Sequence, residues 1–402
     1  MQFDPGTVSL GPVRVLRAAN IVLPDRVVVA DLELEGTQIR ALVPSGAGKG
    51  DECWDLGGYR VAPGFIDLHT HGGWGIDFFR DGRARAIEAA THYGRAGVTR
   101  LLLTLYSAPV DEMLERLSEA ARTCAEEPAF LGIHLEGPFI SADKKGALPP
   151  AGIFAYDDKL LARILAASAG QLRVMTFAPE ALPIGAITRL RAAGVLPSIG
   201  HTACDSAATR AAIIAGAWRA THLCNAMPAL HHRRPGPLAP LLLEERVRVE
   251  VIADGQHVDD EMLRLIIKTK GAERVMVVSD SMPLAGLPPT RATFAGMEVT
   301  TNGVRATLPD GTLAGSTMPM GAALLRMERV LGYTPSQICQ LGSIAPADDL
   351  RLPRTGRVAS AHRADLVISA PDGSIVATLR AGCRVGALAE DAFLPPPIAR
   401  VD

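Results

Sequence analysis

Residues 61–72 read Val-Ala-Pro-Gly-Phe-Ile-Asp-Leu-His-Thr-His-Gly. The first eight of these are a mostly apolar run, which is typical of a buried β-strand, and two histidines follow at its carboxyl end. Seven more runs rich in Val, Ile and Leu lie downstream, at residues 98–105, 130–135, 172–177, 196–199, 219–223, 247–253 and 274–279. Stretches of helical period, such as residues 111–126 and 207–217, separate them. Eight apolar strands that alternate with helices predict an α/β fold, a parallel sheet closed into a (β/α)8 TIM barrel.

The segments on both sides of the barrel have a different pattern. In the first sixty residues, stretches such as 13–16, 21–29 and 31–36 alternate apolar and polar residues between Gly and Pro, as half-buried strands do. Residues 364–368 and 374–378 repeat this pattern around the turn Pro371-Asp372-Gly373. We therefore predict a small β-sandwich domain built from residues 1–61 and 355–402, with the catalytic barrel at 62–354. A chain of 402 residues accommodates both, because a barrel takes about 250 residues.

The composition argues against several classes of protein. Hydrophobic residues make up 48% and charged residues 21% of the chain, and a formal net charge of -2 gives no strong surface field to attract nucleic acid. Residues 1–11 contain Asp4 and Pro5 in place of a basic stretch and an apolar run, and no segment reaches about 18 uninterrupted apolar residues. We expect a cytoplasmic protein without a membrane partner. The six cysteines are scattered, so we expect them to be reduced and mostly buried.

In a (β/α)8 barrel the chemistry takes place at the carboxyl ends of the strands, and here these ends carry many polar residues. Four are histidines and two are acidic: His69, His71, Glu136, His201, His222 and Asp280. A His-x-His pair such as His69 and His71 lies on one face of a strand, and imidazole and carboxylate groups are the ligands of zinc and neighbouring divalent ions. A single histidine at such a position is explained equally well as an ordinary hydrogen-bonded residue and as a metal ligand. Four together at strand ends predict a metal site.

The remaining polar residues need individual interpretations. Asp280 follows the apolar run 275–279, which places its carboxylate in a dry barrel mouth where it can take a proton from metal-bound water. The alternative is a helix N-cap, a position at which Asp is also common. We expect His134 to be a strand residue that faces the surrounding helices, and His92 and His362 to be surface or structural residues.

Five sequence motifs indicate a particular protein family. They are residues 62–72, His134-Leu-Glu-Gly-Pro-Phe139, Gly200-His-Thr202, Thr221-His-Leu-Cys-Asn-Ala-Met227 and Ile252-Ala-Asp-Gly-Gln-His257. In these motifs the chain resembles, nearly from end to end, the N-acetylglucosamine-6-phosphate deacetylases of the amidohydrolase superfamily. The first motif is shared across the superfamily, whereas the Glu136 motif and the Asn225-Ala-Met227 motif are specific to these deacetylases.

The resemblance implies a ligand set and a substrate site. Glu136, His201 and His222 would hold one divalent ion, and His69 and His71, with Glu136 as a bridge, would hold a second. Zinc is the ion that we expect first, with iron, manganese or cobalt as alternatives. The residues implied in binding the sugar phosphate are Ala147, Asn225, Ala226, Arg233, His257, Leu313, Ala314, Gly315 and Ser316. The resemblance also implies a homodimer in which the loop of Arg233, a bidentate phosphate ligand by its chemistry, reaches the active site of the partner subunit.

One residue departs from the family pattern. Leu148 stands where these deacetylases place a histidine that helps to polarise the acetyl carbonyl, and leucine cannot donate a hydrogen bond. Either the metal alone polarises the carbonyl, or a neighbouring donor replaces the histidine, or the acyl group and the substrate differ from the usual ones.

These observations predict an enzyme that hydrolyses N-acetylglucosamine 6-phosphate to acetate and glucosamine 6-phosphate, with Asp280 carrying the proton from water to the departing amine. One alternative is an amidohydrolase that acts on another N-acyl sugar or on an N-acyl amino acid. The other is a catalytically inactive barrel that serves as a binding module. Comparing the turnover of the N-acetyl sugar with and without its 6-phosphate distinguishes the first alternative from the predicted function. An intact set of metal ligands argues against the second alternative.

Overall fold

The computed structural model describes residues 14–386. The parts of the predicted β domain that fall at residues 1–13 and 387–402 therefore lie outside the described residues.

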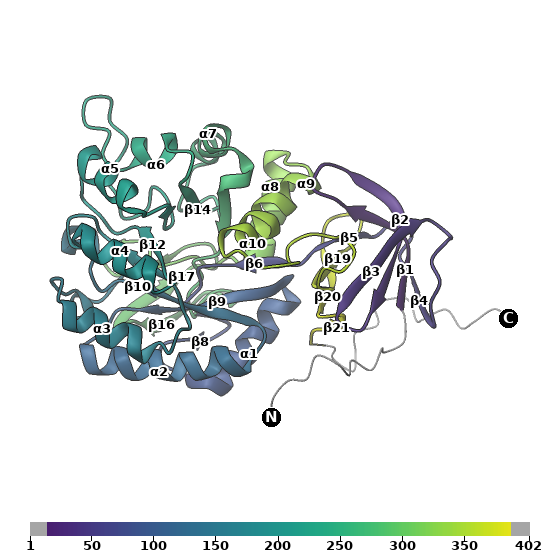
Figure 1. Ribbon diagram of the computed structural model, residues 1–402, viewed down its shortest axis with the longest axis horizontal. Coiled ribbons are helices and arrows are strands. Elements are labelled where there is room, and N and C mark those ends of the chain that lie inside the picture. Colours follow the sequence, from purple (N-terminus) through teal and green to yellow (C-terminus); the bar gives the residue numbers. More distant parts are fainter. Residues whose placement is uncertain (1–13, 387–402) are drawn as a thin grey trace.

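Eight strands form one parallel sheet. This sheet lies inside the larger of the two domains in Figure 1. In chain order the strands are β6 (Phe65–Asp67), β9 (Val98–Tyr106), β10 (Phe130–Glu136), β11 (Leu172–Phe177), β12 (Leu196–Ile199), β13 (Arg219–Ala220), β14 (Arg248–Ile252) and β15 (Val275–Val278). Each strand pairs with the next one in this order, so β6 and β15 are the two ends of the sheet. Backbone hydrogen bonds from Asp280 N to His69 O, at 2.9 Å, and from His71 N to Ser281 O, at 2.8 Å, join the segments that follow these two strands. The sheet is thereby closed into a barrel.

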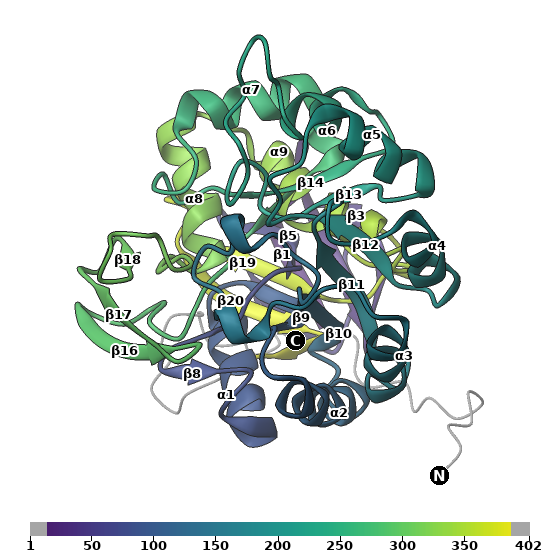
Figure 2. The ribbon, with the colours of Figure 1, turned by 90° about the vertical axis from the view of Figure 1, so that its left-hand side faces the viewer.

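Helices surround the barrel, as Figure 2 shows for α1 to α7. They are α1 (Gly82–Arg95), α2 (Val110–Glu126), α3 (Asp158–Ala167), α4 (Ile184–Ala192), α5 (Ser206–Ala215), α6 (Leu238–Leu243), α7 (Asp260–Lys270) and α8 (Met320–Leu331). Three of them begin at an aspartate, Asp157, Asp205 or Asp259, whose side chain accepts a hydrogen bond from a backbone N–H of the first turn. The apolar stripe of α2, which includes Met113 and Leu117 at i and i+4, is buried.

Shorter helices complete the barrel domain. They are α9 (Pro335–Cys339), the π-helical turn η4 (Gln340–Ile344), α10 (Ala345–Asp349) and the 3-10 turns η1 (Ala142–Lys144), η2 (Pro150–Gly152) and η3 (Ala272–Arg274). Among the residues that the structure describes, no helix is both long enough and apolar enough to cross a membrane.

Both ends of the chain contribute strands to a second sheet, in the order β21-β20-β19-β5-β1-β2-β3, with β4 paired to β1. The strands are β1 (Arg14–Val22), β2 (Val27–Glu35), β3 (Gln38–Pro44), β4 (Glu52–Asp55), β5 (Arg60–Pro63), β19 (Leu366–Ser369), β20 (Ile375–Arg380) and β21 (Cys383–Arg384). They enclose a separate apolar core that includes Leu16, Leu32 and Leu366. The predicted fold class, a barrel with a companion β domain, is confirmed.

The apolar run 61–68, which we expected to be one strand, is divided between the two domains, so that prediction is wrong. Residues up to Pro63 pair in the second sheet as β5, and the barrel strand β6 begins at Phe65. At Gly64, between them, the backbone N–H donates to Asp365 O at 2.9 Å. A Cβ atom at Gly64 would lie 2.2 Å from Thr99 Cγ2, so the crossing between the domains requires glycine.

Two small sheets were not expected. One pairs β7 (Gly72–Gly73) with β8 (Ile76–Asp77), and the other consists of β16 (Thr290–Phe294), β17 (Met297–Thr301) and β18 (Ala306–Thr307). The second follows the last barrel strand and ends before the loop of residues 313–316.

The six cysteines are free, as expected. The expectation of burial is right for Cys124, Cys204 and Cys339, whereas Cys53 and Cys224 are half-buried and Cys383 is exposed.

Candidate active site

The carboxyl ends of the barrel strands surround a cavity of about 500 Å³. Glu136 is the last residue of β10, and His71, His201, His222 and Asp280 follow β6, β12, β13 and β15. All five line the cavity. The strand ends therefore bring together side chains that are far apart in the sequence, as predicted for a barrel.

Three of these residues have left-handed backbone conformations, which are uncommon for side chains with a Cβ atom. The φ angles are 46° for His201, 28° for His222 and 45° for Asp280. Such conformations cost free energy and persist where the surrounding structure holds them, often at functional sites. No helix begins at Asp280, since the next residue, Ser281, forms β-bridges, so the N-cap alternative is not realised.

Glu136, His201 and His222 form a compact group of buried ligand atoms. Glu136 Oε1 lies 3.0 Å from the Nε2 atoms of both histidines, and these two nitrogens are 3.1 Å apart. Burial alone would raise the pKa of Glu136, but the imidazoles of His69 and His201 outweigh this effect and hold its pKa well below the usual carboxyl range. An anionic oxygen and two nitrogens facing one point are a donor set for a divalent cation.

A second group lies beside the first and shares Glu136. His71 Nε2 is 3.1 Å from Glu136 Oε2, and His69 Nε2 is 3.4 Å from Glu136 Oε1. Asp280 Oδ1 lies 3.4 Å from His69 Nε2 and 3.7 Å from His71 Nε2. Within residues 14–386, the buried Nε2 of His69 has no hydrogen-bond partner, which is costly unless a cation occupies this position. The residues present thus fit a divalent cation at two adjacent candidate groups, Glu136, His201 and His222, and His69, His71 and Asp280.

The expectation for His134 is wrong, because the residue faces the barrel interior. Its ring is fully buried and lies 4.4 Å from the ring of His69, centroid to centroid. His92 and His362 were expected at surface or structural positions. His92 stacks on Trp74, and His362 Nδ1 donates to the carbonyl of Ser360, which is consistent with that expectation.

Six of the nine residues expected to bind substrate line the cavity, namely Ala147, Asn225, Ala226, His257, Leu313 and Gly315. The other three do not. Ala314 is fully buried, Ser316 donates its hydroxyl to Asp254, and Arg233 is exposed on the loop around residues 230–234. Leu148 is also part of the cavity wall and is 3% exposed, so a purely apolar side chain occupies this part of the wall.

Asp254 is a residue whose role the sequence did not reveal. Its carboxylate accepts hydrogen bonds from His257 Nδ1 at 2.8 Å and from the hydroxyl of Ser316 at 2.8 Å. It also accepts from the backbone N–H groups of Gln256 and His257. The signal was present, since Asp254 belongs to the motif 252–257, but only the structure connects it to the loop of residues 313–316.

Comparison with known proteins places these features in a family. Residues 60–385 match the model of the Amidohydrolase family. The N-acetylgalactosamine-6-phosphate deacetylase of Escherichia coli O157:H7 is 35% identical over 291 residues, which are 71% of this chain and 77% of that protein. The N-acetylglucosamine-6-phosphate deacetylase of Bacillus subtilis (strain 168) is 33% identical over 330 residues, which are 80% of this chain and 83% of that protein.

A solved structure agrees in fold. A mutant of the N-acetyl-D-glucosamine-6-phosphate deacetylase of Mycobacterium smegmatis, in complex with N-acetyl-D-glucosamine-6-phosphate, matches with a TM-score of 0.88 at 32% identity. The match covers 93% of this chain and 100% of that chain, so it includes most of both domains.

Proposed function

The chain belongs to the amidohydrolase family, and we propose that it removes the N-acetyl group of N-acetylglucosamine 6-phosphate, releasing acetate and glucosamine 6-phosphate for amino sugar catabolism. The observation that carries this proposal is the convergence of Glu136, His201, His222 and Asp280 on one cavity. The related proteins with this activity support the choice of substrate.

The cavity residues supply the steps of an amide hydrolysis. A divalent ion at Glu136, His201 and His222 would lower the pKa of a water molecule and polarise the acetyl carbonyl. The carboxylate of Asp280, at the mouth beside His69 and His71, accepts the proton of the attacking water. It then gives this proton to the amine nitrogen as the C–N bond breaks, which restores the carboxylate.

The proposed ion is zinc, with iron, manganese or cobalt as alternatives, and one or two ions per subunit. Imidazole and carboxylate donors suit all of these metals, so the donor set supports the class of ion. We also propose a cytoplasmic homodimer in which Arg233 binds the substrate phosphate in the partner's site. The exposure of Arg233, away from the cavity of its own chain, supports this arrangement. The proposed division of the chain is 1–61 with 355–402, and 62–354, with its first boundary moved to Gly64 because Ala62 and Pro63 pair with β19 in the second sheet.

N-acetylgalactosamine 6-phosphate is the second candidate substrate. The E. coli relative, at 35% identity, is a deacetylase of this epimer. The apolar Leu148 in the cavity wall leaves a third candidate, another N-acyl compound, because the histidine usual at this position is absent.

The test is acetate release by the metal-reconstituted protein from both N-acetyl hexosamines, each with and without the 6-phosphate. The proposal expects the 6-phosphate of N-acetylglucosamine to have the highest kcat/KM. A preference for the galacto epimer would favour the second candidate, and equal turnover without phosphate would contradict a sugar phosphate substrate. Without turnover of any of these four compounds, the proposed function would be wrong, and the chain would act on another N-acyl compound or be a binding module.

A further inference from the structure

A line of four buried ionisable side chains crosses the barrel and ends at the candidate metal site. Asp349, at the end of α10, pairs with Arg219, the first residue of β13. The same guanidinium pairs with Glu250 on β14, and Glu250 Oε2 lies 3.1 Å from His69 Nδ1. The side chains of His69 and Glu250 are 0% exposed, that of Arg219 is 2% exposed and that of Asp349 is 6% exposed.

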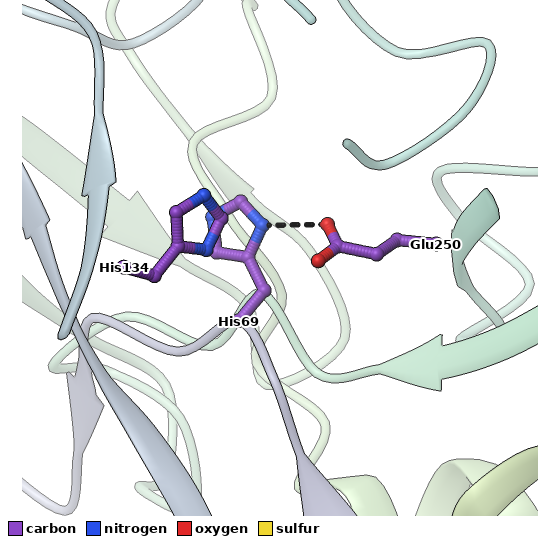
Figure 3. A group of neighbouring side chains, drawn as sticks. All are labelled: His69, His134 and Glu250. Carbon is purple, nitrogen blue, oxygen red and sulfur yellow. Dashed lines mark hydrogen bonds and ion pairs between the residues drawn. The ribbon is translucent and has the colours of Figure 1, made fainter. Parts of the chain in front are cut away.

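The contact between Glu250 and His69, drawn in Figure 3, determines which nitrogen of His69 is free. A carboxylate only accepts hydrogen bonds, so Nδ1 of His69 carries the proton and donates it to Glu250. The lone pair is then on Nε2, on the opposite edge of the ring, 3.4 Å from both Glu136 Oε1 and Asp280 Oδ1. A metal-binding histidine is commonly fixed in this way by a carboxylate on its other nitrogen.

The three side chains drawn in Figure 3, those of His69, His134 and Glu250, do not form a separate metal site. His134 Nδ1 lies 3.2 Å from the carbonyl oxygen of Leu68, which can only accept, so this nitrogen donates. Its Nε2 therefore accepts from the hydroxyl of Thr176 at 2.8 Å. With both nitrogens of His134 engaged, and Nδ1 of His69 protonated, Glu250 is the only metal donor left in the group.

Glu250 also contacts the other half of the metal site. Its Oε2 accepts a hydrogen bond from the backbone N–H of His222 at 3.3 Å. The Glu250 carboxylate thus contacts the side chain of one candidate ligand, His69, and the backbone of another, His222. The φ angle of His222 is 28°. Arg219 fixes the other oxygen, and Asp349 balances the charge of this buried guanidinium.

We propose that Glu250 is a positioning residue for the ion held by His69 and His71, and that Arg219 holds its carboxylate in place. This inference rests on the metal centre of the proposed function and adds a residue that is not itself a ligand. Loss of the Glu250 carboxylate frees the His69 ring to turn or to change tautomer. The expected effect is selective, because Glu250 contacts the imidazole of His69 but only the backbone N–H of His222, whose Nε2 faces Glu136 Oε1.

The test compares Glu250→Gln with Asp349→Asn. Glutamine has the same shape, but its amide NH2 must face either His69 Nδ1–H or the Arg219 guanidinium, donor against donor. Asp349→Asn perturbs the same Arg219 and keeps the Glu250–His69 contact, so it is the matched control for a disturbed buried charge. Each metal-free protein is titrated with Co²⁺, with ions per folded chain measured by elemental analysis and affinities by competition with a chromophoric chelator.

For Glu250→Gln we expect one ion at wild-type affinity and a second bound about 10- to 100-fold more weakly, the typical effect of losing such a partner. Asp349→Asn should bind two ions as the wild type does, even if it unfolds more easily. If Glu250→Gln does not fold, Glu250→Asp, whose shorter carboxylate cannot reach Arg219 and His69 together, should show the same selective weakening.

Two ions at wild-type affinity in the Glu250 variant would overturn the inference. Equal weakening in the Asp349 variant, or a wild-type protein that holds a single ion, would overturn it as well. A wild type that holds two ions but releases no acetate would instead refute the proposed function and leave the role of Glu250 to the titration.

Discussion

Replacing Asp254 with asparagine tests how the substrate end of the cavity is held. Burial alone would raise the pKa of Asp254, but the hydrogen bonds from His257 and the neighbouring amides outweigh this effect and lower the pKa from 3.8 to about 2. Each pKa unit corresponds to about 1.4 kcal/mol, so the carboxylate contributes about 2 kcal/mol to folding at neutral pH. In Asp254→Asn the amide NH2 replaces one of the two carboxylate oxygens. At Oδ2 it faces His257 Nδ1–H and the Ser316 hydroxyl, and at Oδ1 it faces the backbone N–H groups of Gln256 and His257, so it meets a donor in either orientation. We therefore expect the free energy of unfolding to fall by about 2 kcal/mol at pH 7.

The pH dependence of this loss has a definite sign. The folded pKa is depressed, so the stabilisation is fully present above about pH 4 and disappears as the pH falls towards about 2. Urea unfolding of wild type and Asp254→Asn should therefore give the same difference at pH 7 and at pH 5. A difference that shrinks between these two values, where Asp254 is ionised in both folded and unfolded chains, would refute the reasoning.

The same substitution should change substrate binding, because Asp254 accepts a hydrogen bond from His257, a proposed substrate contact that lines the cavity. We expect a higher KM for the 6-phosphate substrate with a smaller change in kcat. Asp31→Asn is the matched control, since Asp31 is also buried and accepts backbone hydrogen bonds from Ala18, Gly46 and Gly48, but lies in the other domain. It should lose stability without any change in KM. An unchanged KM in Asp254→Asn would remove Asp254 from the substrate site.

Three further predictions concern the reaction and its ligands. Asp280→Asn should keep its metal and lose about two to four orders of magnitude in kcat, the usual contribution of a positioned acid–base group, and wild-type turnover in the metal-loaded variant would exclude this role. His201→Ala should abolish activity and deplete metal, whereas His69→Ala should lose at most one ion; elemental analysis with the opposite result would mean that the two sites are assigned the wrong way round. Arg233→Ala should raise KM for the 6-phosphate substrate and leave an unphosphorylated analogue unaffected, and equal effects on both would show that Arg233 does not bind phosphate.

Much of the barrel could be predicted from the sequence, because its strands are short apolar runs with polar residues at their ends. The same logic explains the error at His134. His134 and Glu136 are two residues apart on β10, and side chains alternate along a strand, so both must point to the same side. Strict use of this period would have placed His134 inside the barrel with Glu136.

Other features could not be predicted because they depend on contacts distant in the sequence. Glu250 is an acidic residue inside an apolar strand, and nothing local shows that its partners are Arg219 and His69. The small sheet β16–β18 brings Phe294 to the cavity wall, although its strands have no apolar run of the barrel type. Such positions are fixed by packing between elements and not by local pattern.

Asp280 connects the metal side of the cavity with the substrate side through its backbone. Its N–H donates to His69 O at 2.9 Å, a bond that also helps to close the barrel between β6 and β15, and its carbonyl accepts from Ser316 N at 2.8 Å. Both partners belong to segments with proposed functions, the metal-binding His69 and the loop of residues 313–316. Because the backbone is held on both sides at a left-handed φ of 45°, the carboxylate of Asp280 has a fixed origin beside the ligands. A proton carrier needs this property, since it must reach first the water and then the amine nitrogen from one position.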